Sequence, residues 1–326
     1  MELESRFISI ANRVIRLRAP TKEVAVSLEN LLSNWTVTFL RQPPTQPVDA
    51  DISVRAATAL PQIPPDFEVF EFPTGGQCLT NGETYFFRLE NALVKTAAQT
   101  PIVEVWLSAD LPEMNKSALM NTVTSAFTVA LRRCGSYELH AAALAHPATG
   151  AGLLLAGKTH SGKSTLAVSL ASRGWRHLSD DTILLRLENG AVKADSLRHG
   201  FVLRPKTIEK LSLPEFRKDT RGLAMKRRFD SQDLFADQFQ HSCKPSAIFF
   251  PTITEEEVSR TEKLSQTEAV QQLMKISPWS CFDRPIAEKN IALLVQLSKQ
   301  CKLYNLSLGT DLLDVDAANA FFERYY

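Results

Sequence analysis

Residues 157–164, Gly-Lys-Thr-His-Ser-Gly-Lys-Ser, have the types and spacing that suit a bound phosphate chain. Glycines at both ends let the backbone curl, so that successive N–H groups point at phosphate oxygens. A helix starting at Lys163 adds the positive end of its dipole. The Lys163 ammonium reaches the β- and γ-phosphates, and the Ser164 hydroxyl binds Mg²⁺. The pattern predicts a site for ATP and Mg²⁺. Its expected residues are Gly157, Lys158, Thr159, His160, Ser161, Gly162, Lys163, Ser164 and Thr165.

The context of this segment favours a phosphate loop over the alternative, a glycine-rich turn that only caps a helix. An apolar strand at 153–155 leads in and a helix leads out, as the motif requires. His160 fills a position where any residue fits, so it either touches a phosphate or stays solvated.

Two adjacent carboxylates, Asp180 and Asp181, follow one helix and one turn later. A strand returning beside the loop strand brings a carboxylate towards Ser164 and the metal. One acid can bind Mg²⁺ while the other accepts the proton of an attacking hydroxyl. Neighbouring side chains of a strand point to opposite faces, so both serve one site only if the backbone bends. The alternative is a polar turn before a strand.

The composition is that of an ordinary globular protein. The chain has 326 residues, 44% apolar and 22% charged, with 37 Lys plus Arg against 36 Asp plus Glu. A net charge of +1 gives no global attraction to nucleic acid or to an anionic membrane, and we expect neither as a partner. Five widely spaced cysteines without a C-x-x-C pair favour a reducing compartment. The charged N-terminus leads into no apolar segment, so we expect a cytoplasmic protein.

The elements that must position these residues fall into two expected domains, 1–115 and 116–326. The first is a smaller α+β domain of unknown role, with a helix over 21–35, strands at 14–18 and 102–107, and a hairpin turn at Asn81-Gly82. The second begins with an amphipathic helix over 116–133. It continues with strands at 139–145 and 152–156, a helix over 163–172, a strand at 182–185 and a hairpin turn at Asn189-Gly190. Later come a strand at 247–250, a capping box at 265–268, and helices over 286–299 and 315–326.

Taken in order, these segments resemble the HPr kinase/phosphorylase family and its bacterial relatives. The residues that carry the resemblance are His140, the strand at 152–157, the phosphate loop, the turn Ser172-Arg173-Gly174-Trp175-Arg176-His177 and the pair Asp180-Asp181. It is strongest over 139–187 and continues weakly through 264–273 and 304–306.

The resemblance implies an α/β P-loop kinase domain akin to phosphoenolpyruvate carboxykinase, with a mixed sheet, behind the smaller N-terminal domain. It also implies roles. Lys163 corresponds to the phosphate-binding lysine and Ser164 to a metal ligand, shared with Asp181. Asp180 corresponds to the proton acceptor and His140 to the active-site histidine. Taken alone, His140 is equally a core histidine that ends a strand.

Three functions remain open on the sequence. The first is transfer of the ATP γ-phosphate to a hydroxyl, expected on Ser or Thr of a protein or peptide. The second is a kinase for a small metabolite, and the third is a nucleotide-binding ATPase or regulator that phosphorylates nothing. Two basic features, Arg204 and the run from Arg217 to Arg228, either contact phosphates or an acidic peptide or stay solvated. The sequence is compatible with a homo-oligomer.

Overall fold

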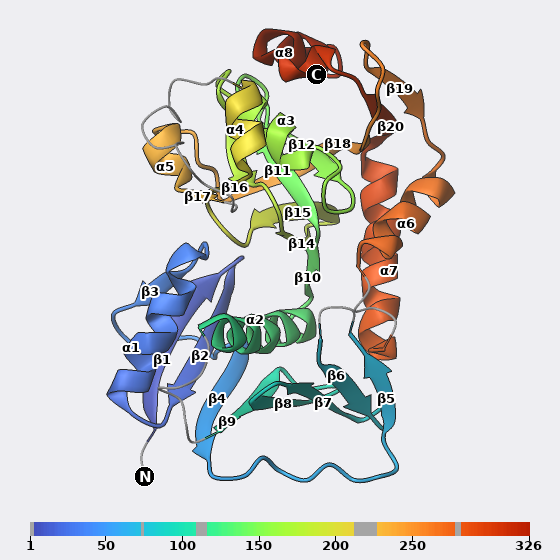
Figure 1. The fold of residues 1–326 in the computed structure, drawn as a ribbon. Coiled ribbons are helices and arrows are strands. Elements are labelled where there is room, and N and C mark those ends of the chain that lie inside the picture. Colours follow the sequence, from blue (N-terminus) through green and yellow to red (C-terminus); the bar gives the residue numbers. More distant parts are fainter. Residues whose placement is uncertain (1–2, 73–74, 109–115, 212–226, 278–281) are drawn as a thin grey trace. The chain divides into compact units, whose positions relative to one another are not determined.

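The computed structural model describes residues 3–72, 75–108, 116–211, 227–277 and 282–326. The chain divides into two compact units. The first unit comprises Met1–Tyr137 and Trp279–Asn290, and the second comprises Glu138–Pro278 and Ile291–Tyr326. Each unit has its own large sheet (Figure 1).

The first unit is built on a nine-stranded sheet with the order β3-β1-β2-β4-β9-β8-β7-β6-β5. Its strands are β1 (Glu4–Ile10), β2 (Arg13–Ala19), β3 (Thr38–Leu40), β4 (Ala50–Ala57), β5 (Glu68–Glu71), β6 (Gln77–Thr80), β7 (Thr84–Leu89), β8 (Ala92–Ala97) and β9 (Ile102–Ser108). Alternating residues of β2 and β9 are buried, as a sheet with one covered face requires. The hairpin predicted at Asn81-Gly82 joins β6 to β7 and is confirmed.

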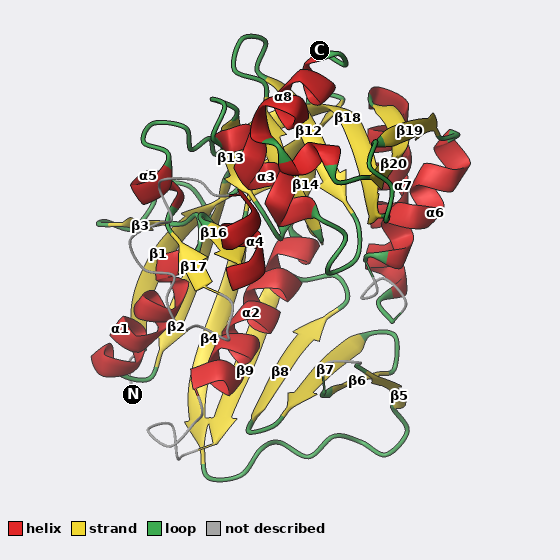
Figure 2. Cartoon of the chain, turned by 45° about the horizontal axis from the view of Figure 1, so that its top comes forward, coloured by secondary structure: helices red, strands yellow, loops and turns green. Residues whose placement is uncertain are grey.

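Two helices, α1 (Lys22–Leu31) and α2 (Lys116–Arg133), pack on this sheet and on each other (Figure 2). A 3₁₀ turn, Leu32–Asn34, extends α1. The predicted helix over 116–133 is confirmed, but it belongs to the first unit. The contact division therefore falls at Tyr137/Glu138 and not at the expected 115/116, because α2 buries its apolar side on β4, β8 and β9.

The later segment 279–290 completes the first unit through a buried ion pair. Nη1 of Arg133 lies 2.5 Å from Oδ2 of Asp283, and both side chains are 1% exposed. Nε of Arg133 also donates to the carbonyl of Ala97 at 2.9 Å. Helix α7 (Arg284–Gln300), which follows Asp283, is divided between the two units.

The sheet of the second unit is mixed, as predicted. Its main order is β10-β14-β15-β18-β12-β11-β13, with β20 beside β18 and β19 beside β20. The strands are β10 (Ser136–Leu139), β11 (Ala141–Ala145), β12 (Ala151–Ala156), β13 (Arg176–Ser179), β14 (Ile183–Glu188), β15 (Ala191–Ser196), β18 (Ser242–Ile253), β19 (Arg260–Lys263) and β20 (Lys302–Leu308). β12 runs parallel to β18, and β18 parallel to β20, whereas β11 and β15 are antiparallel to their neighbours.

Burial explains why β12 lies inside the sheet. Leu153, Leu154 and Leu155 are fully buried, which is the pattern of a strand covered on both faces. Helix α3 (Lys163–Ala171) packs on β11 and β12, and α8 (Val315–Glu323) packs on α3 (Figure 2). Their shared core includes Trp175, which is fully buried.

Smaller elements complete the second unit. They are α4 (Pro205–Leu211), α5 (Ser231–Leu234), α6 (Gln266–Lys275), the 3₁₀ turn Asp311–Leu313, and the ribbon of β16 (Phe201–Leu203) with β17 (Arg227–Phe229). The hairpin predicted at Asn189-Gly190 joins β14 to β15, and both residues have positive φ, 51° and 76°. In the part of the chain that the structure describes, no helix has the length and apolar character to cross a bilayer. The cysteines described there, Cys78, Cys134, Cys243 and Cys301, are all free thiols.

Candidate active site

The loop between β12 and α3 has the shape that its glycines predict. Gly162 is the N-cap of α3 and has a φ of 98°. A Cβ atom there would lie 2.5 Å from Cδ2 of Leu308, so a side chain would be both strained and obstructed. Lys163 and Ser164 then form the first turn of α3. Their position places the helix N-terminus, whose first N–H groups make no bond within the helix, at the loop.

The Lys163 ammonium lies within the curve of the loop. Nζ donates to the carbonyls of Gly157 and Lys158, both at 2.8 Å, and lies 3.2 Å from Nε2 of His140. The side chain is largely buried, with 5% of its residue surface exposed. The buried ammonium and the positive end of the α3 dipole both favour an anion at this loop.

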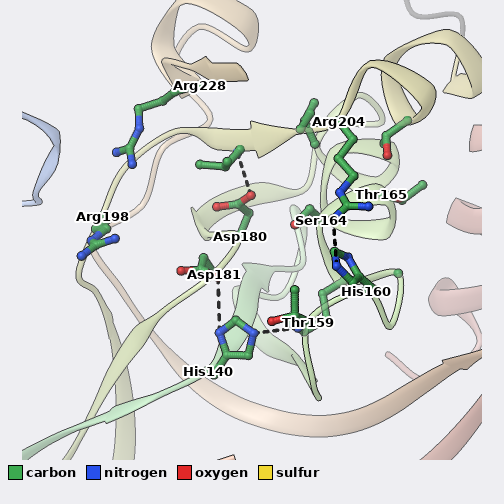
Figure 3. Close-up of a pocket in the computed structure, with 15 residues that line it drawn as sticks. His140, Thr159, His160, Ser164, Thr165, Asp180, Asp181, Arg198, Arg204 and Arg228 are labelled. Atoms are coloured by element: carbon green, nitrogen blue, oxygen red, sulfur yellow. Dashed lines mark hydrogen bonds and ion pairs between the residues drawn. The ribbon is translucent and has the colours of Figure 1, made fainter. Parts of the chain in front are cut away.

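His140 connects the lysine to one of the two aspartates. It lies at the break between β10 and β11, and Nδ1 lies 3.3 Å from Oδ1 of Asp181. With its proton on Nδ1, the imidazole turns its N–H side to the Asp181 carboxylate and accepts from Lys163 at Nε2. Figure 3 shows the ring between the carboxylate and the loop. The contacts therefore place His140 among the predicted site residues.

Asp180, which follows the end of β13, points away from His140 (Figure 3). Its carboxylate accepts from the N–H of Val202 at 2.8 Å, and the nearby Ser164 hydroxyl favours its charged form. The residue is only 4% exposed, and burial raises the pKa of Asp180 to about 7. Asp181 is more open, with 46% of its side chain exposed. The backbone bends just after β13, so both acids line one cavity despite their opposite directions.

This cavity, of about 260 Å³, has a cationic lining. Its described charged side chains are Lys163, Arg198, Arg204, Arg228, Asp180 and Asp181, besides two histidines. Arg198 and Arg228 lie on one side of the aspartates, and Arg204 and His160 lie on the other (Figure 3). Nη2 of Arg204 is 2.8 Å from Nε2 of His160, so His160 is not merely solvated. Four cations against two carboxylates give the cavity a net attraction for anions.

The donors present fit a magnesium nucleotide. Ser161 Oγ is buried and has no hydrogen-bond partner within the described part of the chain, which suits a loop whose partner is a phosphate oxygen. Hard oxygen donors, the Ser164 hydroxyl and the two carboxylates, are the kind that Mg²⁺ uses when phosphates complete its shell. No cluster of three or more His, Cys, Asp or Glu side chains that could hold a metal ion occurs among the described residues.

The structure brings most of the predicted site residues to one place, with two differences. The Ser164 hydroxyl acts on Asp180, whose charged form it favours, whereas the predicted metal ligand Asp181 faces His140. Three loop residues, Gly157, Lys158 and Ser161, line a different cavity from the one that holds the aspartates. Arg198 was missed because it follows a strand with no motif around it. In the basic run, residues 217–226 lie outside the described part of the chain, and Arg228 lines the cavity.

Comparisons with known proteins give a limited result. No family model and no curated protein matches the chain. A solved structure that it resembles is the Hpr(Ser) kinase/phosphatase from Coxiella burnetii. The match has 15% sequence identity and a TM-score of 0.31, and it covers 57% of this chain and 95% of that one. A likeness at this level decides neither the activity nor the substrate of this chain.

Proposed function

We propose that this protein is an ATP-dependent kinase that transfers the γ-phosphate to a hydroxyl of a protein or peptide. The observation that carries the proposal is the position of Asp180. This buried carboxyl, with a pKa raised to about 7, lines the same cavity as Lys163 and Ser164 at the end of a phosphate loop. A general base works best when its pKa is near the working pH. A protein that only binds nucleotide has no need of such a group.

Each residue has a role in this proposal. Lys163 holds the β- and γ-phosphates. Ser164 and the carboxylate of Asp181 hold Mg²⁺. His140 orients Lys163 and Asp181 through its two ring nitrogens. Asp180 accepts the proton of the attacking hydroxyl. The bound nucleotide supplies the phosphoryl group, and the chain contributes positioning and charge neutralisation.

The test incubates the protein with Mg²⁺, γ-labelled ATP and a cell extract, beside Lys163→Ala and Asp180→Asn. Lys244→Ala and Asp233→Asn, both exposed in the same unit, are matched controls. We expect label on a protein band, lost in both site variants and kept in both controls. Label on a small molecule indicates the metabolite kinase, and label only in free phosphate indicates an ATPase. Equal protein labelling by Asp180→Asn would remove Asp180 as the base.

A further inference from the structure

A second cavity lies against the phosphate loop. It has a volume of about 560 Å³, and its lining combines the loop with the end of β18 and the end of α6. The lining residues are Ala156, Gly157, Lys158, Thr159, His160, Ser161, Phe250, Pro251, Thr252, Ile253, Gln272, Lys275 and Ile276. Thr159 and His160 also line the cavity that holds the aspartates. The two cavities therefore meet at the tip of the loop.

We propose that this second cavity binds the adenine base and ribose of the nucleotide, an inference that rests on the proposed kinase function. The reason is the order of residues along the loop. Lys163 and Ser164 line the first cavity with Asp180, so the transferred end of the triphosphate lies there. Gly157, Lys158 and Ser161 line only the second cavity. A phosphate chain that crosses Thr159 and His160 leaves its nucleoside on that second side.

The walls of the second cavity have the chemistry of a base site. Phe250 and Pro251 are buried, and Ile253 follows them with 59% of its surface exposed. Ile276 adds a further apolar side chain from beyond the end of α6. A purine ring has apolar faces, so covering it with these side chains removes apolar surface of both partners from water.

Polar recognition comes from Gln272. Its Nε2 donates to Oδ1 of Asn305 at 3.0 Å, so its carbonyl oxygen is the end that remains to accept from a ligand. The exocyclic amino group of adenine is such a donor. Lys275, exposed one helical turn further along α6, adds a cation to the same wall.

Helix α6, which forms one wall of the second cavity, is fixed in place at its start and along its buried side. A capping box fixes the start of α6, since Ser265 accepts from the N–H of Glu268 and the Glu268 carboxylate accepts from the N–H of Ser265. Two residues of α6 itself, Ala269 and Leu273, are fully buried. Positions 272, 275 and 276 share one side of the helix at the spacing of three and four residues. The cavity is therefore formed before any ligand arrives.

Calorimetry with two probes tests the proposal: MgADP, and magnesium tripolyphosphate, which lacks base and ribose. The test variant is Ile253→Ser/Gln272→Ala, which leaves the charge unchanged. The matched control is Val258→Ser/Gln271→Ala. Val258 is exposed to the same 59%, Gln271 neighbours Gln272, and neither lines the cavity. We expect the test variant to lose about tenfold or more in MgADP affinity, with less than about a twofold change for tripolyphosphate. The control should bind both probes as the unaltered protein does.

The outcomes separate this inference from the kinase proposal. If the unaltered protein binds neither probe, the kinase proposal fails and the base site fails with it. If it binds both probes equally well, or if the test variant keeps its MgADP affinity, the phosphate loop stands and the base site is overturned. An equal loss for both probes also overturns the base site, because the substitutions would then act on the loop.

Discussion

Asp180 accepts a hydrogen bond from the backbone N–H of Val202, 2.8 Å away, and is almost completely enclosed. The hydrogen bond favours the charged carboxylate, but burial outweighs it, so the pKa rises to about 7. A carboxyl poised in this way carries out proton transfer only when it has lost its proton. The raised pKa of Asp180 should therefore affect both the rate of phosphoryl transfer and the free energy of unfolding.

The rate of phosphoryl transfer should depend on pH with one apparent pKa near 7 on the acidic side. Below that value Asp180 holds its proton and cannot accept another. We expect kcat/KM for the labelled acceptor to rise about tenfold between pH 6 and pH 8. MgADP affinity over the same range serves as the control for nucleotide binding. A flat profile would exclude Asp180 as the base.

Asp180→Asn should stabilise the protein at alkaline pH. The folded pKa, about 7, is above the unfolded value of about 3.9, so the folded state holds the proton between these values while the unfolded state has lost it. Stability is therefore lost as the pH rises towards 7, and an amide escapes this loss. We expect a gain in the free energy of unfolding of about 1–4 kcal/mol at pH 8, shrinking towards pH 5, in urea titrations. A gain that is independent of pH would contradict this origin.

His177 should make the second unit sensitive to acid. The ring is completely buried 4.0 Å from the centroid of Phe201, and neither nitrogen has a hydrogen-bond partner in the described part of the chain. Burial lowers the pKa of His177 to about 3, below the unfolded value of about 6.5. The unfolded state therefore takes up the proton first, and stability falls as the pH drops below about 6.5, by up to about 1.4 kcal/mol per pH unit.

His177→Leu removes this proton uptake and the two buried nitrogens. We expect the variant to lose less stability between pH 7.5 and pH 5 in urea titrations followed by circular dichroism. His241→Gln, at an exposed position in the same unit, should behave like the unaltered protein. The same acid sensitivity in His177→Leu would show that another group is responsible.

Asp283→Asn should destabilise the first unit by about 3–5 kcal/mol, because Arg133 would keep a charge with 1% exposure and lose its counter-charge. The double variant Arg133→Met/Asp283→Leu should recover much of that loss, since it leaves no buried charge. Urea titrations of both variants measure this. The open pair Arg173–Asp316 is the contrast, and Asp316→Ala should change stability little. A small effect at Asp283 would mean that water or other groups reach Arg133.

Local signals of the sequence predicted much of the fold. The helix over 116–133, both Asn-Gly hairpin turns and the capping box at Ser265 are all present. Each of these features depends on residues close together in the sequence, through an apolar period or a residue that favours positive φ. A short stretch of sequence is therefore enough to predict it. The loop residues and the aspartate pair were predicted as site residues from the same kind of local signal.

Relationships between distant segments were not predictable. Arg198 joins the site from the connection between β15 and β16, and Val202 joins it from β16. Phe250 to Ile253 reach the loop because β18 runs parallel to β12. Strand neighbours of this kind are set by the packing of the whole sheet. The expected boundary at 115/116 differed for the same reason, since an amphipathic helix does not reveal which sheet its apolar side will cover.

The chain returns late to the unit where it began. Residues 279–290 belong with 1–137, and Arg133 meets Asp283 only through that return. On a ribosome that adds about 5–20 residues per second, roughly ten to thirty seconds separate the synthesis of the two partners. During that interval the nascent first unit carries an arginine without its aspartate. Its final consolidation is therefore tied to the synthesis of the larger segment of the second unit, Glu138–Pro278.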